Sequence, residues 1–528
     1  MGAARGRVQP GPQKTRYVRR LAGNGAAYTA ARVISKLIAV ALLPLYTRFL
    51  TPADYGAAEV MFAAVVAMSI VIRFGLIESL LRFYYRAGED PDRVVSTSFA
   101  ALFWAGTLAV IILMPFAGGI SEALLGVDQT GLAQIALGGL WVLTLSEYLL
   151  TLFRLDEEAR QFFVVTMLSV LLTIPVTVVL VVFLEMGAEG LLLGSYGTGL
   201  VIVLGLIFWH RHRLSLVFDR ELLKKLLRFG LPTMPAELSL YSLNFIDRIL
   251  VARFLGLAEA GLYSLAVMIS QSVTVLVRGF QLAFPPLAYS ITDDDEARRA
   301  YSVIVTWFAV LMAFVVAAVW LTAPWIVRIF AAPDYFPAVE AVGPVAAGTA
   351  LYALYMVLLV VLGRTGRTEF NFPATLAGVG TNIVLNVILL PELGILGAGI
   401  SLAVSYLVVL VLMFIFTQRL FPVPYEWGRL AKAIGAAAAV VAIGTLFVPD
   451  DGLGPLALRL LLLAALPGLM LLLDFFTPEE RRYLALLRQP GELRAKLAET
   501  AGKREPDGPD RGLPEVYEVE QMNEDMRE

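Results

Sequence analysis

Long apolar segments follow one another along almost the whole chain and are separated by short polar loops. There are fourteen of them, near residues 25–50, 54–81, 94–117, 131–153, 162–184, 189–209, 226–255, 259–285, 300–327, 337–362, 370–390, 395–417, 429–448 and 455–474. A helix needs about 20 apolar residues to cross a bilayer, whereas strands of a membrane barrel are shorter and alternate in polarity. The pattern therefore predicts an all-α polytopic membrane protein with about 14 transmembrane helices.

The composition agrees with this class and excludes several kinds of site. Only 16% of the 528 residues are charged, whereas in soluble globular proteins about a quarter are. The chain has no cysteine and two histidines, which excludes disulfides, thiolate nucleophiles and histidine-rich metal centres. We expect no cofactor and no nucleic-acid partner, and coupling to a Na⁺ or H⁺ gradient stays open.

The distribution of Lys and Arg among the loops predicts the orientation. Alternate loops are basic, at residues 82–93, 154–160, 211–228, 293–299, 364–367 and 418–432, whereas the loops at 118–131, 185–190 and 391–397 contain neither Lys nor Arg. Lys and Arg concentrate on the cytoplasmic side of membrane proteins. We therefore expect a multi-pass protein of the inner (plasma) membrane with both termini in the cytoplasm.

The two ends of the chain differ from the apolar segments. Residues 1–24 predict a basic cytoplasmic N-terminus. Residues 477–528 predict a cytoplasmic tail, which begins as a short helix capped at Thr477 and becomes disordered from about Lys503, where apolar residues are few.

A short sequence near the first loop is repeated later in the chain. Residues 48–56 read RFLTPADYG, and residues 253–261 read RFLGLAEAG. The same offset of 205 residues relates Arg73 to Arg278. Six apolar segments separate the two copies, so both would start on the same side of the membrane, which makes the repeat parallel and typical of alternating-access transporters.

The repeat predicts the domain organisation. We expect two pseudo-symmetric six-helix lobes, at residues 25–215 and 216–422, followed by two further helices within residues 423–476. In the first copy, Thr51 followed by Pro52 and Asp54 predicts an N-cap, an N1 proline and a first-turn acid for the second helix. The opening stretch is thus mainly architectural.

Two regions resemble a known family. Residues 229–271 read FGLPTMPAELSLYSLNFIDRILVARFLGLAEAGLYSLAVMISQ, and residues 35–56 read SKLIAVALLPLYTRFLTPADYG. Both resemble polysaccharide-type flippases of the multidrug/oligosaccharidyl-lipid/polysaccharide exporter superfamily. The resemblance implies a transporter, not an enzyme, that moves a polyprenyl-diphosphate-linked oligosaccharide to the periplasmic leaflet for cell-surface polysaccharide such as lipopolysaccharide. The partners it implies are the lipid-linked substrate, the bilayer, and polymerases or glycosyltransferases of the same pathway.

Several cations fall within the apolar segments, where ionisable side chains are costly and usually face a cavity or a partner. The candidate substrate-binding residues are Arg32, Lys36, Arg73 and Arg278. Arg32 and Lys36 are four residues apart and share one helix face. Guanidinium groups bind phosphate in a bidentate fork, and lysine acts as a point charge. For Arg73 and Arg278, snorkelling towards the interface or structural pairing is an equal alternative.

Three acids are candidates for gating or ion coupling, namely Glu237, Asp247 and Glu147. Glu237 is offset by 205 residues from Arg32, so we expect these two to pair between the lobes. Glu147 is on the same helix as Arg154, which favours a structural role. Asp247 precedes Arg248, and this pair is either an ion pair within one lobe or a cation-coupling site.

Other functions remain alternatives. A cation-coupled multidrug exporter would need an acid cluster and a drug pocket, and the deep cations favour an anionic substrate instead. A peptidoglycan-precursor flippase carries the same diphosphate, and charge does not distinguish it. A polymerase or ligase would need a large extracytoplasmic loop, and the loops predicted on that side are short.

Overall fold

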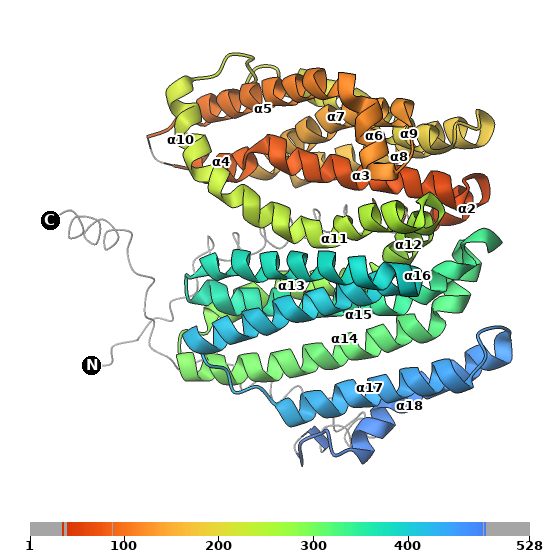
Figure 1. Ribbon diagram of the computed structural model, residues 1–528. Coiled ribbons are helices and arrows are strands. Elements are labelled where there is room, and N and C mark those ends of the chain that lie inside the picture. The colour runs from red at the N-terminus through yellow and green to blue at the C-terminus, as the bar shows by residue number, and fades with distance from the viewer. Residues whose placement is uncertain (1–33, 36–37, 39, 87, 479, 482–528) are drawn as a thin grey trace, which may run out of the picture. The chain divides into compact units, whose positions relative to one another are not determined.

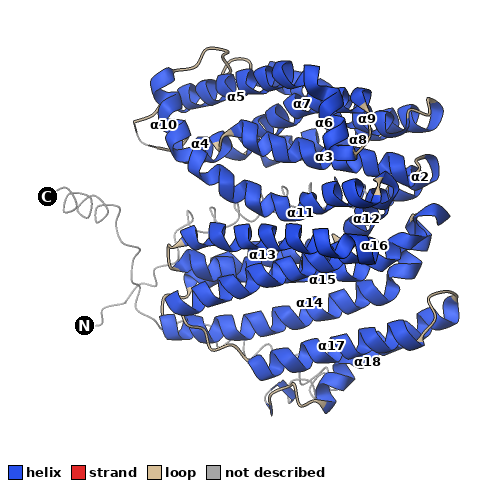
Figure 2. Ribbon diagram, viewed as in Figure 1, coloured by secondary structure: helices blue, strands red, loops and turns tan. Residues whose placement is uncertain are grey.

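The computed structural model describes residues 34–35, 38, 40–86, 88–478 and 480–481. Within these residues every regular element is a helix (Figures 1 and 2). Ten of the described helices are long and apolar enough to cross a membrane. The prediction of an all-α multi-pass membrane protein is therefore confirmed. Arg32, Lys36, the basic N-terminus and the tail after residue 481 lie outside the described residues.

The helices follow the predicted segments closely. They are α2 (Leu43–Phe49), α3 (Pro52–Arg73), α4 (Leu76–Phe83), α5 (Pro91–Leu113), η1 (Met114–Phe116), α6 (Ala117–Leu125), α7 (Thr130–Leu155), α8 (Ala159–Val178), η2 (Val179–Phe183), α9 (Gly187–His210), α10 (Arg220–Gly230), η3 (Leu231–Thr233), α11 (Met234–Leu255), α12 (Leu257–Ser270), α13 (Val273–Ser290), α14 (Asp294–Phe330), η4 (Pro333–Ala338), α15 (Val339–Arg364), η5 (Thr368–Phe370), α16 (Asn371–Leu420), α17 (Trp427–Phe447) and α18 (Leu453–Leu472).

Three predicted segments are each divided in the structure. The segment at 54–81 breaks between α3 and α4, where Phe74 and Gly75 have φ of 50° and 66°. The segment at 226–255 breaks at the η3 turn, because Pro232 has no backbone N–H for a helical hydrogen bond. The segment at 259–285 divides into α12 and α13.

Four differences separate the ten spans recognised by length and composition from the fourteen predicted. Helix α11 carries Glu237, Asp247, Arg248 and Arg253, α12 has 14 residues, and the 18 residues of α13 include Arg278 and two prolines. Helix α16 joins two predicted segments across Gly394, whose φ of 58° and ψ of −143° are not helical. Twelve of the 26 residues of the first predicted segment lie outside the described residues, and α2 covers only its last part. The number fourteen stays a prediction.

The start of α3 has the predicted cap. The Thr51 hydroxyl accepts a hydrogen bond from the Asp54 backbone N–H at 3.1 Å, and the Asp54 carboxylate accepts from the Thr51 N–H at 3.3 Å. Pro52 is the first residue of the helix. This capping box confirms the expected architectural role of the stretch at 48–56.

The two copies of the repeat pack against each other. Helix α3 begins at Pro52 and α12 at Leu257, which keeps the offset of 205 residues. A Cβ on Gly56 would lie 2.0 Å from the carbonyl oxygen of Leu257, and a Cβ on Gly261 would lie 1.9 Å from that of Pro52. Only glycine permits this approach. Equivalent residues meeting face to face support a parallel repeat, and the division into two six-helix lobes stays a prediction.

Helix α11 packs against both α3 and α16, and α3 also packs against α7 (Figure 1). These contacts bring side chains from distant parts of the sequence to one place. The described residues from Pro467 onward form a separate unit. Within it the Glu480 N–H donates to the Thr477 hydroxyl at 3.3 Å, and the Thr477 N–H donates to the Glu480 carboxylate at 2.8 Å, which places the predicted N-cap.

Candidate functional site

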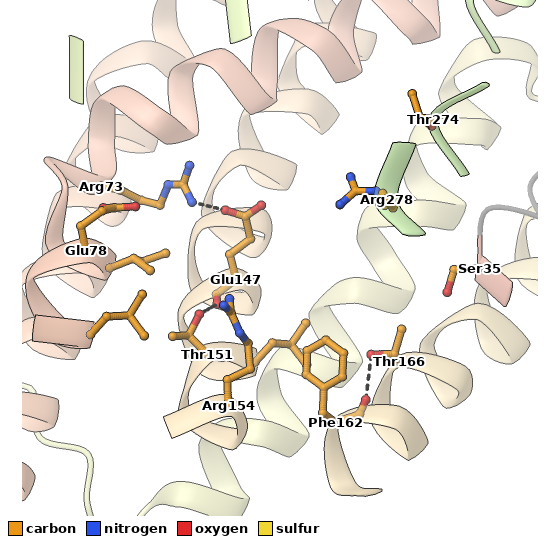
Figure 3. Close-up of a pocket in the computed structure, with 13 residues that line it drawn as sticks. Ser35, Arg73, Glu78, Glu147, Thr151, Arg154, Phe162, Thr166, Thr274 and Arg278 are labelled. Carbon is orange, nitrogen blue, oxygen red and sulfur yellow. Dashed lines mark hydrogen bonds and ion pairs between the residues drawn. The ribbon is translucent and has the colours of Figure 1, made fainter. Parts of the chain in front are cut away.

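A cavity of about 640 Å³ opens between α3, α4, α7, α8 and α13 (Figure 3). We call it the arginine cavity, because Arg73, Arg154 and Arg278 line it. Its other polar lining residues are Ser35, Glu78, Glu147, Thr151, Thr166 and Thr274. Three guanidinium groups and two carboxylates therefore line one cavity, together with apolar side chains.

Arg73, at the end of α3, connects three helices. Its guanidinium pairs with Glu147 of α7 and, through Nη2 at 2.9 Å, with Glu237 of α11. The Arg73 side chain is 10% exposed, whereas those of Glu147 and Glu237 are 39% and 37% exposed. Glu147 lines the cavity and pairs with the arginine there, where a ligand can reach it, whereas Glu237 pairs with the arginine from outside the lining.

Arg154 of α7 and Arg278 of α13 are different. Both are exposed, and within the described part of the chain neither makes a hydrogen bond or an ion pair. In Figure 3 the Arg278 guanidinium extends across the cavity towards Arg73 and Glu147. Their donors are available to a ligand, and a planar donor fork suits a phosphate or carboxylate group.

The cavity brings together several of the predicted site residues. Arg73 and Arg278 line it with Glu147, while Arg32 and Lys36 lie outside the described residues. The pairing expected between Glu237 and Arg32 has no counterpart in the described residues, where Arg73 is the partner of Glu237. Arg73 also forms an ion pair with Glu147, because α3 packs against α7. Arg154 therefore has no ion-pair partner among the described residues.

Asp247 does not line this cavity. It is buried, with only 1% of its surface exposed. Its carboxylate accepts hydrogen bonds from the Tyr263 hydroxyl at 2.9 Å and from the Asn386 amide at 2.7 Å. The alternative of an Asp247–Arg248 ion pair is wrong. Arg248 instead pairs with Glu59 of α3 at 3.1 Å, because consecutive residues leave a helix in different directions.

Sequence reasoning missed three polar residues that the fold brings into these networks. Glu59 is a lone acid within an apolar segment. Arg154 was noted only as a neighbour of Glu147, and its place in the arginine cavity was not predicted. Asn382 and Asn386 are four residues apart in a long apolar helix, and this spacing was a readable signal for a shared polar face. Among the described residues no group of three or more His, Cys, Asp or Glu could hold a metal ion.

Comparison with known proteins places the chain in a family. A family model described as polysaccharide biosynthesis protein matches residues 45–340. An uncharacterized membrane protein of Methanocaldococcus jannaschii is 24% identical over 457 residues, covering 77% of this chain and 85% of that protein. The succinoglycan biosynthesis transport protein ExoT of Rhizobium meliloti is 26% identical over 291 residues, covering 53% of this chain and 56% of that protein.

Solved structures share the fold. The lipid II flippase MurJ, in an inward closed conformation, has a TM-score of 0.68 at 13% identity, covering 84% of this chain and 98% of that one. An inward-facing multidrug resistance MATE transporter of the MOP superfamily has a TM-score of 0.62 at 18% identity, covering 73% and 94%. Since the family model covers more than half of the 528 residues, the chain belongs to the polysaccharide biosynthesis protein family, with the fold of MOP-superfamily transporters.

Proposed function

We propose that this transporter is a flippase that moves a polyprenyl-diphosphate-linked oligosaccharide from the cytoplasmic to the outer leaflet by alternating access. The observation that carries the proposal is the arginine cavity, where Arg154 and Arg278 are unpaired among the described residues. Arg278 falls within a predicted apolar segment, where an unpaired cation is costly and needs an anionic ligand or a water-filled space, and Arg154 stands at the end of α7 beside a basic loop. A diphosphate offers several acceptor oxygens to such forks.

The substrate diphosphate would also reach Arg73. Phosphate oxygens bound to Arg154 and Arg278 would compete with Glu147 and Glu237 for the Arg73 guanidinium. Each of these acids is more than a third exposed, so its pairing with Arg73 is worth about 1 kcal/mol or less. Binding would weaken the connection between α3 and α11 and so shift the population between the two access states.

The rest of the substrate fits the same geometry. The hydrophilic head would cross inside the cavity, and the polyprenyl chain would stay in the lipid, where burying it costs nothing. The similarity to a succinoglycan biosynthesis transport protein supports a glycan as the head. Polymerases and glycosyltransferases of the same pathway are the proposed partners, and the proposed location is the plasma membrane with both termini cytoplasmic.

We assign gating to Glu237 and Glu147, and ion coupling to Asp247. Glu237 and Glu147 hold Arg73, which joins the helices that have to separate. Asp247 is buried among Tyr263, Asn382 and Asn386. Its carboxylate and the oxygen atoms of these neighbours are hard ligands of the kind that Na⁺ requires. The same carboxylate can instead take up a proton.

Reconstitution in proteoliposomes tests the proposal. Three labelled substrates are compared: a polyprenyl-diphosphate oligosaccharide, a peptidoglycan precursor on the same lipid, and a cationic drug. We expect the oligosaccharide lipid to cross, and the double substitution Arg154→Gln with Arg278→Gln to reduce its rate at least tenfold. Arg367→Gln is the matched control, since Arg367 pairs with Glu369 outside the cavity. Transport of the drug alone, or a preference for the peptidoglycan precursor, would contradict the proposal.

A further inference from the structure

A second cavity, of about 260 Å³, adjoins the first and is lined by α2, α3, α8, α9 and α12. We call it the hydroxyl pocket, because Tyr46, Ser169, Thr173 and Ser195 line it together with the carboxylate of Glu59. Its volume is below the roughly 300 Å³ at which ordinary ligand pockets begin. It therefore has room for one small ring rather than for a whole oligosaccharide.

The hydroxyl pocket borders the arginine cavity. Ser35 lines both spaces. Along α8, Phe162 and Thr166 line the arginine cavity, and Ser169 and Thr173 line the hydroxyl pocket. Spacings of four, three and four residues keep these side chains on one face of the helix. Thr166 and Ser169 are about 4.5 Å apart along the axis, so a group in the pocket directly follows a group in the cavity.

Several hydroxyls of the pocket have unused hydrogen-bonding capacity. Outside the pocket, Thr166 and Thr198, like many of the described helical Ser and Thr, donate to the carbonyl four residues earlier, at 2.7 and 2.6 Å. Within the described residues, the hydroxyls of Tyr46, Ser169 and Ser195 make no hydrogen bond. Each can donate and accept, as a ligand that is itself rich in hydroxyls requires.

The charge of the pocket differs from that of the arginine cavity. Among the described lining residues Glu59 is the acid, and no Arg or Lys lines the pocket with it. Arg248 pairs with the Glu59 carboxylate from α11 at 3.1 Å. A carboxylate accepts hydrogen bonds from neutral hydroxyls and repels phosphate. The two adjoining spaces therefore select different parts of a molecule.

We propose that the hydroxyl pocket binds one sugar residue of the carried glycan while the diphosphate lies in the arginine cavity. This inference rests on the proposed function and adds to it a recognition site for the sugar. Glu59, Ser169 and Ser195 supply the polar contacts, and the rings of Tyr46 and Phe62 supply apolar surface for the carbon-bound face of the sugar ring.

The experiment compares two lipids in proteoliposomes, a polyprenyl diphosphate that carries the oligosaccharide and the same polyprenyl diphosphate without sugar. The double substitution Ser169→Ala with Ser195→Ala removes two hydroxyls of about 1 kcal/mol each, so we expect the apparent affinity for the glycan-bearing lipid to fall about 30-fold. Transport of the bare lipid is expected to stay unchanged. Thr445→Ala is the matched control, because the Thr445 hydroxyl is exposed and bonds its own helix at Val441.

A binding measurement separates this inference from the proposed function. Saturation-transfer NMR with the free oligosaccharide, which has no lipid or phosphate, is expected to detect binding to the wild-type protein and its loss on Ser195→Leu, which fills the pocket. Thermal unfolding checks that each variant is folded, and the alanine pair replaces Ser195→Leu if that variant is not. An equal loss of affinity for both lipids, or no effect of the alanine pair, would show that the pocket is only a water-filled passage. Either result would overturn the inference. Failure of either lipid to cross, with free glycan still bound at the pocket, would count against the flippase and not against the sugar site.

Discussion

Two acids of helix α11 have opposite surroundings, although they are ten residues, about 15 Å, apart. Glu237 is 37% exposed and shares Arg73 with Glu147. Asp247 is 1% exposed and accepts hydrogen bonds from Tyr263 and Asn386. A ligand or water can replace the partner of Glu237 at little cost. The partners of Asp247 have no such replacement, and removing the acid leaves buried donors unsatisfied.

The ion pair between Glu59 and Arg248 lies between these extremes. Its side chains are 21% and 13% exposed. If burial decides the energetics of polar contacts in this chain, the cost of breaking each contact should increase from Glu237 to Glu59 to Asp247. We expect the conformational changes of transport to break the contact of Glu237 most readily, that of Glu59 less readily, and those of Asp247 least.

The largest effect is expected for Asp247→Ala. The Tyr263 hydroxyl and the Asn386 amide would lose their acceptor, at about 1–3 kcal/mol for each buried donor, so the loss of stability should be about 3 kcal/mol or more. Thermal unfolding in detergent measures it. Asp247→Asn keeps the volume and removes the charge, so it should unfold closer to the wild type while losing any dependence of transport on a Na⁺ or H⁺ gradient. A wild-type melting temperature for Asp247→Ala would contradict the importance given to burial.

Glu59→Gln tests the intermediate case. The Arg248 guanidinium, whose Nε already has no hydrogen-bond partner among the described residues, would lose its counter-charge in a mostly buried place. We expect a loss of about 2 kcal/mol, below that of Asp247→Ala and above that of a surface pair. The matched control is Glu369→Gln, since that acid pairs with Arg367 at more than half exposure on both sides. Equal losses for the two variants would remove the distinction by burial.

The sequence was sufficient to predict the class of fold and part of the site. The lengths of the apolar segments alone predicted the helices. A segment of about 20 residues spans the bilayer core, and there its backbone N–H and C=O groups must hydrogen-bond to each other. Arg73 and Arg278 were identifiable as cations within apolar segments, and they do meet in one cavity. The partner of Glu237 was not predictable, because an offset in sequence gives equivalence between copies and does not give contact.

The remaining errors have physical causes at particular residues. The adjacency of Asp247 and Arg248 suggested an ion pair, but one residue turns a helix by about 100°, so Asp247 contacts α12 and α16 while Arg248 contacts α3. Glu59 was overlooked as a single acid, and its partner comes from a helix about 190 residues later. Which buried charge finds which partner depends on helix packing, and that is not encoded in hydropathy.

Glu237→Gln should lower the stability less than Asp247→Ala or Glu59→Gln. Arg73 would keep Glu147, so the expected loss is about 0.5 kcal/mol. Transport is expected to change up to about fivefold, because a pair worth about 1 kcal/mol or less can shift the two access states only by that factor. A double-mutant cycle of Arg73→Gln and Glu237→Gln measures the pair itself. A coupling above about 2 kcal/mol would show that the pair behaves as a buried one.

The smallest effect is expected at Asp219, in the loop before α10 and outside the membrane segments. Its pKa is lowered, first by the backbone N–H of Leu222, which donates to its carboxylate at 3.1 Å, and then by the Arg93 guanidinium. A lowered folded-state pKa means that the stabilisation is present above the unfolded value of about 3.9 and is lost as the pH falls through the folded pKa. Between pH 7 and pH 5 no change is therefore expected from this group.

Asp219→Asn is the matched variant, because Asn is an equally good N-cap and does not titrate. Melting temperatures of the two proteins should differ by a constant small amount from pH 7 to pH 5 and converge below about pH 4, as the aspartate becomes protonated. Convergence already at pH 6 would show that Asp219 is not held ionised by its helix and by Arg93. Since this contact is open to water, a difference as large as that of Glu59→Gln would contradict the ordering of polar contacts by burial.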